Sequence, residues 1–189
     1  MNLPNAITLF RLVLTVVFVG VASLDTVLGF RIALASFILA AISDFLDGHL
    51  ARKMNLVTAL GKLLDPLADK ILVCAGFVFL SAEGLAPVWV TSLIIAREFL
   101  VTGIRQIAVE KGHVMAADSL GKWKTTFQLI FCITALVHLS FPGDNLLQTL
   151  SGPGGIYLLE ASMWIATALT AVSGFNYFLK NRSLFPSIN

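Results

Sequence analysis

Four aspartates lie close together in an otherwise apolar stretch, and they are four of the chain's 11 acidic residues. Asp44 and Asp47 are three positions apart, and Asp65 and Asp69 are four apart. In an α-helix, either spacing places two side chains on one face, about one turn from each other. Hard divalent cations prefer carboxylate oxygens, and magnesium often shares its coordination with a substrate phosphate. The pattern therefore predicts a site at which two cations clamp a phosphoryl group.

Glycine and arginine residues accompany these aspartates. Gly48 and Gly61 expose bare backbone, which a ligand can approach closely. Arg52 has the side chain that pairs best with a phosphate. His49 is the nearest histidine but does not share the face of the first aspartate pair, so zinc is not expected. The alternative interpretation is that the acids and Arg52 are ordinary charges of a solvated loop.

The composition indicates a membrane protein. The chain has 189 residues, of which 57% are hydrophobic and 13% are charged, and its mean hydropathy is +0.88. Soluble domains carry roughly 25% charged residues, so a soluble chain of this composition could not cover its surface. We expect one helical membrane domain covering residues 1–189.

Six apolar segments approach the length of about 20 residues that a helix needs to cross the hydrocarbon core. They are Ala6–Leu24, Val27–Leu46, Thr58–Leu80, Pro87–Ile107, Thr125–Phe141 and Ile156–Leu179. The fold class that they predict is an all-α, polytopic bundle of six transmembrane helices with an N-terminal juxtamembrane segment. The stretch Gly48–Val57 is expected to be a loop between the second and third helices.

The basic residues predict the orientation of this bundle, because cytoplasmic loops are enriched in lysine and arginine. Nine of them border one side, and only Arg31 borders the other. The nine are Arg52, Lys53, Lys62, Arg105, Lys111, Lys122, Lys124, Lys180 and Arg182. Both termini and the four aspartates are therefore expected on the cytoplasmic side.

A second group of charges predicts a binding pocket for an anion. Arg97 and Arg105 lie eight positions apart on the fourth segment, and Lys124 opens the fifth. An acceptor that carries its own phosphate needs such a pocket. The alternative is that Arg97 pairs with Asp118 or another acid; Glu98 is expected to point elsewhere on the helix.

The N-terminal residues allow two interpretations. Pro4 and Asn5 open a helix that carries Thr8 and Arg11 on one face. They form either a helix cap with an interfacial anchor or a wall of the nucleotide pocket.

The pattern Asp44-x2-Asp47-Gly48-x2-Ala51-Arg52-x8-Gly61-x3-Asp65-x3-Asp69 resembles the complete signature of the CDP-alcohol phosphotransferase family. The resemblance implies a six-helix membrane enzyme, usually a homodimer, which transfers a substituted phosphate from a CDP-linked alcohol to a hydroxyl group and releases CMP. It also implies that the four aspartates bind two divalent ions, Mg²⁺ or Mn²⁺, and that Asp69 doubles as the catalytic base. The residues that it implies for nucleotide binding are Asp44, Gly48, Arg52, Thr58 and Gly61.

Three further segments resemble the bacterial phosphatidylglycerophosphate synthases of this family: LPNAITLFR, IIAREFLVTGIRQ and GKWKTTFQ. This resemblance implies CDP-diacylglycerol as donor, glycerol 3-phosphate as acceptor, a bacterial inner membrane as location and no nucleic-acid partner. Two other interpretations remain open. One is another family member, such as a cardiolipin synthase. The other is a cation or proton transporter, although its acids should be spread across the bilayer.

Overall fold

The computed structural model describes residues 3–54, 59–110, 119–142 and 153–180. Within these ranges all regular structure is helical, which confirms the predicted all-α class. The helices are α1 (Leu3–Ala22), α2 (Val27–Met54), α3 (Ala59–Ala82), α4 (Val88–Glu110), α5 (Ser119–Ser140) and α7 (Pro153–Lys180). Each corresponds to one of the six predicted segments.

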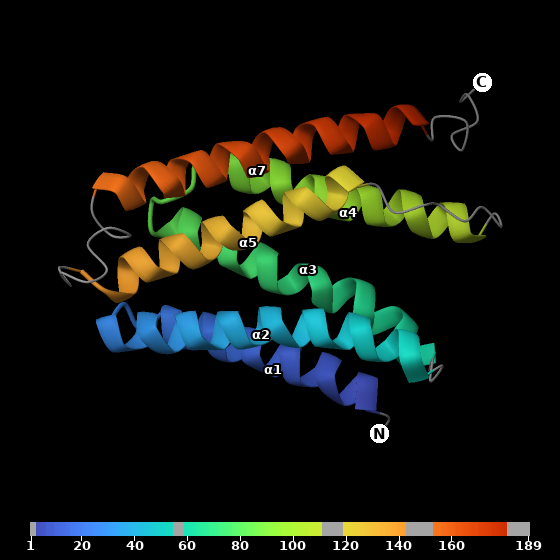
Figure 1. Cartoon of the computed structure of the whole chain (residues 1–189), viewed down its shortest axis with the longest axis horizontal. Helices are drawn as coiled ribbons and strands as arrows, with labels where there is room; N and C mark the ends of the chain where they lie inside the picture. The colour runs from blue at the N-terminus through green and yellow to red at the C-terminus, as the bar shows by residue number, and fades with distance from the viewer. Residues whose placement is uncertain (1–2, 55–58, 111–118, 143–152, 181–189) are drawn as a thin grey trace.

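The helices lie side by side along the long axis of the molecule (Figure 1). α1 packs against α2 and α3, and α7 packs against α4 and α5. Contacts of α5 with α2, and of α3 with α4 and α5, join these two groups. The start of α1, the end of α2, the start of α3 and the end of α4 all lie at one end of the bundle, on the right of Figure 1. We call this end the motif end, because it carries the aspartate motif.

The prediction of a loop over Gly48–Val57 is wrong for most of its length, because α2 continues as a helix to Met54. A single glycine inside a helix costs about 1 kcal/mol. The following residues, from His49 to Met54, include good helix formers and offset that cost. The helix therefore carries the motif residues Gly48 and Arg52 as well as Asp44 and Asp47.

Phenylalanine side chains form the centre of the core. Phe18 of α1 and Phe37 of α2 meet edge to face with ring centroids 5.4 Å apart. Phe77 of α3 and Phe131 of α5 lie 5.1 Å apart. All four side chains are completely buried. These contacts hold together the helices that position the motif end.

Gly76 of α3 allows two neighbouring helices to approach closely. A Cβ atom at this position would lie 3.1 Å from the Cys132 sulfur of α5 and 3.1 Å from the Phe37 ring of α2. Both distances are shorter than ordinary van der Waals contact, so the position excludes larger side chains.

Replacing Gly76 with valine should therefore lower the Tm of the purified protein in detergent. Overpacking of a tight core typically costs about 1–3 kcal/mol. The matched control is Gly20→Val in α1, because a Cβ atom at Gly20 meets nothing within 4 Å. Equal Tm values for the two variants would contradict the close packing around Gly76.

Buried hydroxyl groups bond within their own helices. Thr15 donates to the carbonyl of Arg11 at 2.9 Å, and Thr134 donates to the carbonyl of Ile130 at 2.8 Å. Thr167 and Ser140 make the same kind of bond. Such bonds satisfy the hydroxyl without a partner from another helix. Polar side chains can therefore lie inside the bundle at little cost.

The outside of the bundle is strongly apolar. Large apolar side chains that are 65% or more exposed occur on α1, α2, α4 and α7, namely Val16, Leu28, Val88, Tyr157 and Phe175. Among the described helices, the segment Ile156–Leu179 is long and apolar enough by itself to cross a bilayer. The shorter apolar segments are Ala6–Ala22, Val27–Ser43 and Lys70–Ala82.

Candidate active site

The four aspartates of the motif lie on two helices that pack against each other. Asp44 and Asp47 belong to the C-terminal half of α2, and Asp65 and Asp69 belong to the N-terminal half of α3. Because both segments are helical, each pair is separated by about one turn. The side chains of these residues are outside the part of the chain that the structure describes. Their roles as ligands therefore remain predictions.

The other residues of the motif follow the same two helices. Gly48 and Arg52 lie in the last two turns of α2, and Gly61 lies in the first turn of α3. Thr58 is outside the described residues. The motif residues thus occupy the C-terminal part of α2 and the N-terminal part of α3, on either side of the chain segment that joins the two helices.

The donor atoms of this motif fit a hard divalent cation. Two helices that pack together contribute four carboxylates, and oxygen ligands of this kind suit Mg²⁺ or Mn²⁺ better than softer metals. Among the side chains that the structure describes, no group of three or more His, Cys, Asp or Glu residues could hold a metal ion. The side chains of the four aspartates lie outside that set, and their role as ligands stays a prediction from the sequence.

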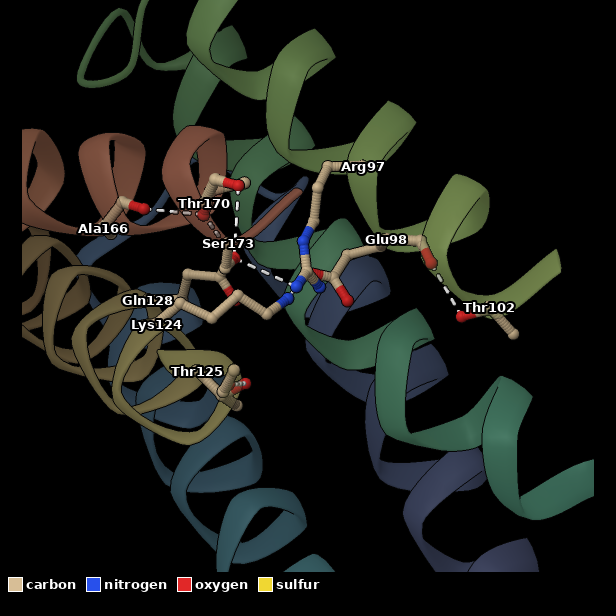
Figure 2. Close-up of polar contacts among 10 residues, drawn as sticks. Arg97, Glu98, Thr102, Lys124, Thr125, Gln128, Ala166, Thr170 and Ser173 are labelled. Atoms are coloured by element: carbon tan, nitrogen blue, oxygen red, sulfur yellow. Dashed lines mark hydrogen bonds and ion pairs between the residues drawn. The ribbon is translucent and has the colours of Figure 1, made fainter. Parts of the chain in front are cut away.

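A cluster of three charges lies between α4, α5 and α7 (Figure 2). The Lys124 ammonium forms an ion pair with Glu98 Oε1, and Arg97 Nη1 lies 3.6 Å from the same oxygen. Glu98 is 7% exposed and Lys124 is 3% exposed. Two basic side chains thus share one carboxylate oxygen. We call these three residues the charge cluster.

Residues of α7 hold Arg97 in this cluster. Arg97 Nη2 donates a hydrogen bond to Ser173 Oγ at 3.0 Å. A Cβ atom at Gly174 would lie 3.0 Å from Arg97 Cγ, so the glycine makes room for the arginine side chain. Gln128 of α5 donates to Thr170 Oγ1 of α7 at 3.3 Å. Figure 2 shows these polar contacts next to one another.

The structure brings Arg97 and Lys124 together, as the hypothesis of an anion pocket requires, but it places Arg105 differently. Arg105 lies two turns further along α4 and is exposed at the motif end. Residues eight apart on a helix differ by about 80° in direction, which explains why the two arginines separate. The role of Arg105 in binding remains a prediction.

The expectation that Glu98 points away from Arg97 is wrong. Both side chains are long, and they converge on the same space although their Cα atoms are adjacent. Asp118, the other suggested partner of Arg97, is outside the described residues. A signal for Glu98 was present in the sequence. It follows the buried Ile94 by four positions and precedes the buried Val101 by three, so it lies on the buried face of α4.

The first turns of α1 lie at the motif end, and α1 packs against both motif helices. Thr8 is 1% exposed and Arg11 is 2% exposed. The side chain of Asn5 is outside the described part, although its backbone belongs to α1. Arg11, which is buried one turn from Thr8, is therefore a further candidate site residue. The sequence pattern alone left open whether it anchors the helix at the interface or lines the nucleotide pocket.

Comparison with known proteins identifies the family. Residues 1–172 match the family described as CDP-alcohol phosphatidyltransferase. The chain is 40% identical to a Bacillus subtilis protein named CDP-diacylglycerol–glycerol-3-phosphate 3-phosphatidyltransferase, with 95% of each chain covered. It is 36% identical to a Rickettsia typhi protein of the same name, over 97% of this chain and 99% of that one.

A similar relative occurs in Arabidopsis thaliana. That protein is named CDP-diacylglycerol–glycerol-3-phosphate 3-phosphatidyltransferase 2 and is 35% identical over 85% of this chain and 73% of its own. The matched regions include both the aspartate motif and the charge cluster. From the motif, its position on two packed helices and these nearly full-length matches, we conclude that the chain belongs to the CDP-alcohol phosphatidyltransferase family.

Proposed function

We propose that this chain transfers the phosphatidyl group of CDP-diacylglycerol to sn-glycerol 3-phosphate, giving phosphatidylglycerophosphate and CMP. The observation that carries this proposal is the nearly full-length similarity to proteins named for this reaction. The charge cluster supports the choice of acceptor, because Arg97 and Lys124 form a buried cationic site that a neutral alcohol would not need.

The four aspartates would hold two divalent ions at the facing ends of α2 and α3. When bound, such ions neutralise charge on a diphosphate and stabilise the departing CMP. The nucleotide itself would be held by the backbone around Asp44 and by Gly48, Arg52, Thr58 and Gly61. Asn5 and Thr8 of α1 would line the same pocket, because α1 packs against both motif helices.

The proposed chemical step is an in-line displacement at the β-phosphorus of CDP-diacylglycerol. The Asp69 carboxylate accepts the proton of the 1-hydroxyl of glycerol 3-phosphate. The hydroxyl oxygen then forms a bond to the β-phosphorus, and the bond from this phosphorus to the bridging oxygen breaks. That oxygen leaves with CMP, and the phosphatidyl group remains on the acceptor.

The acceptor would be held by its own phosphate on Arg97 and Lys124, with Arg105 attracting it at the motif end. α3 supports this arrangement because it packs against both α4 and α5. The base and the cationic site would therefore lie near opposite ends of one small acceptor molecule.

We further propose that the six helices span a bilayer. The exposed apolar side chains on several helices support this proposal, because a patch of that extent would be unstable in water. Basic residues gather at the motif end. The exposed acids Asp25, Glu83 and Glu160 belong to the α1–α2 connection, the α3–α4 connection and the N-terminal part of α7, and these segments lie at the other end of the bundle (Figure 1). By the positive-inside rule, the motif end and both termini face the cytoplasm.

This orientation suits a water-soluble acceptor and a nucleotide product, which both belong to the cytoplasm, while the lipid donor stays in the bilayer. We place the protein in a bacterial inner membrane as a homodimer, following the resemblance of its motifs.

Incubation of the purified protein with CDP-diacylglycerol and labelled glycerol 3-phosphate tests the function. The expected result is CMP release with transfer of the label into lipid. Release of CMP only with phosphatidylglycerol as acceptor would instead identify a cardiolipin synthase. Absence of CMP release with either acceptor would overturn the enzymatic proposal.

A further inference from the structure

Glu98 is a buried carboxylate that the proposed mechanism does not use. Its Oε1 atom contacts both the Lys124 ammonium and the Arg97 guanidinium. This oxygen is buried and makes no hydrogen bond apart from these two ionic contacts. In the described part of the chain, it is the atom that joins the cation of α5 to the cation of α4.

Stability alone does not account for this arrangement. Replacing a buried ion pair by well-packed apolar residues is often neutral or stabilising, because two charges must leave water to form the pair. An ionisable residue within a membrane helix is likewise costly, and it usually marks a functional site. Apart from Thr91, whose hydroxyl donates to the Phe77 carbonyl, the other described buried residues of α4 are apolar, including Val90, Ile94 and Val101. A charge at Glu98 therefore needs a reason beyond packing.

The geometry gives such a reason. Lysine has a flexible stem with four carbons, and without a partner its ammonium would not remain at one place. Two cations that meet inside the bundle would also repel each other. The Glu98 carboxylate offsets this repulsion and ties Lys124 to Arg97, while Ser173 holds Arg97 from the other side. The two basic side chains are thereby fixed in position.

We propose that Glu98 is a positioning residue that sets the affinity of this enzyme for the phosphate group of its acceptor. It holds the Arg97 and Lys124 side chains in place to meet the phosphate of glycerol 3-phosphate. This inference rests on the proposed function, because it assigns a role within the same acceptor pocket.

The test is the steady-state kinetics of Glu98→Gln, which keeps the shape of the side chain and removes its charge. The Michaelis constant for glycerol 3-phosphate should rise about tenfold or more, as expected when a buried charge pair loses one partner. The kcat and the Michaelis constant for CDP-diacylglycerol should stay within about twofold of wild type, because those interactions lie elsewhere. Glu98→Asp, which keeps the charge on a side chain one carbon shorter, should raise the same Michaelis constant selectively but by a smaller factor.

The matched control is Glu160→Gln, which removes the same charge from an exposed position in α7 and should change no constant. Unchanged acceptor affinity in Glu98→Gln would overturn the inference. A parallel loss of kcat, of affinity for both substrates and of Tm would also overturn it, because it would indicate a structural role. If Glu98→Gln does not fold, Glu98→Asp decides: a wild-type acceptor affinity contradicts the inference, and a selective loss supports it.

A double-mutant cycle with Lys124→Met tests the positioning role of Glu98 separately from the proposed function. If Glu98 acts through Lys124, Glu98→Gln should add little to the loss already caused by Lys124→Met. Fully additive effects would contradict the positioning role while leaving the proposed function intact. A wild-type protein that releases no CMP with glycerol 3-phosphate would overturn both.

Discussion

Asp69→Asn should abolish CMP release from CDP-diacylglycerol while leaving the protein folded. Asparagine has nearly the same size as aspartate but cannot accept a proton from the acceptor hydroxyl. Loss of a positioned general base typically costs about 10²–10⁴-fold in rate, and a lost metal ligand would add to this effect. The measurement is CMP release by purified protein in detergent, together with Tm.

The chain offers a matched control for this variant. Asp25 is exposed at the end of the bundle away from the motif and adopts a positive φ of 49°. Asparagine tolerates this backbone conformation, so Asp25→Asn changes the same functional group without straining the turn. It should retain full activity. Normal turnover by Asp69→Asn would eliminate this residue as the base.

Removal of divalent metal should have an effect of similar size. After treatment with EDTA, the enzyme should lose nearly all activity, because four carboxylates at one site repel each other and the donor diphosphate adds more negative charge. Addition of Mg²⁺ or Mn²⁺ should restore turnover.

Binding of Mn²⁺, followed by electron paramagnetic resonance, gives a readout that does not depend on turnover. About two ions per chain are expected, as in other two-metal sites, and Asp65→Asn should lower the amount bound. Glu83→Gln, at an exposed position away from the motif, is the control and should leave it unchanged. Full activity after exhaustive chelation would contradict the metal proposal.

The sequence alone predicted the helices and the family well, because both depend on local patterns. Apolar runs separated by polar breaks indicate helices whatever their partners are. The aspartate motif depends on residue types at fixed spacing, and α2 and α3 carry each pair on continuous helix, although the second segment was predicted to end at Leu46. The end of α2 was predicted too early because the apolar segment ends at Leu46, whereas several of the polar residues that follow still favour helix.

The charge cluster could be predicted only in part, because it depends on which helices pack together. The spacing suggested that Arg97 and Lys124 serve one pocket, but it did not indicate that α7 lies beside them. Ser173 and Gly174 carry no signal of their own, since serine and glycine occur in many membrane helices. The prediction for the direction of Glu98 was wrong because it considered α4 alone. Lys124, which pairs with Glu98, belongs to α5.

The contact between Arg97 and Ser173 also has a consequence for biogenesis. If the helices enter the bilayer in chain order, α4 carries Arg97 and Glu98 into the membrane before α5 and α7 have been synthesised. Arg97 and Glu98 can already pair within α4, and Lys124 joins them once α5 arrives. The hydrogen bond from Arg97 to Ser173, however, forms only after α7, the last of the described helices. An exposed charge within the hydrocarbon core is costly. We therefore expect α4 to stay beside the insertion machinery until α7 emerges, and a chain truncated before Ser173 to be a substrate for membrane proteases.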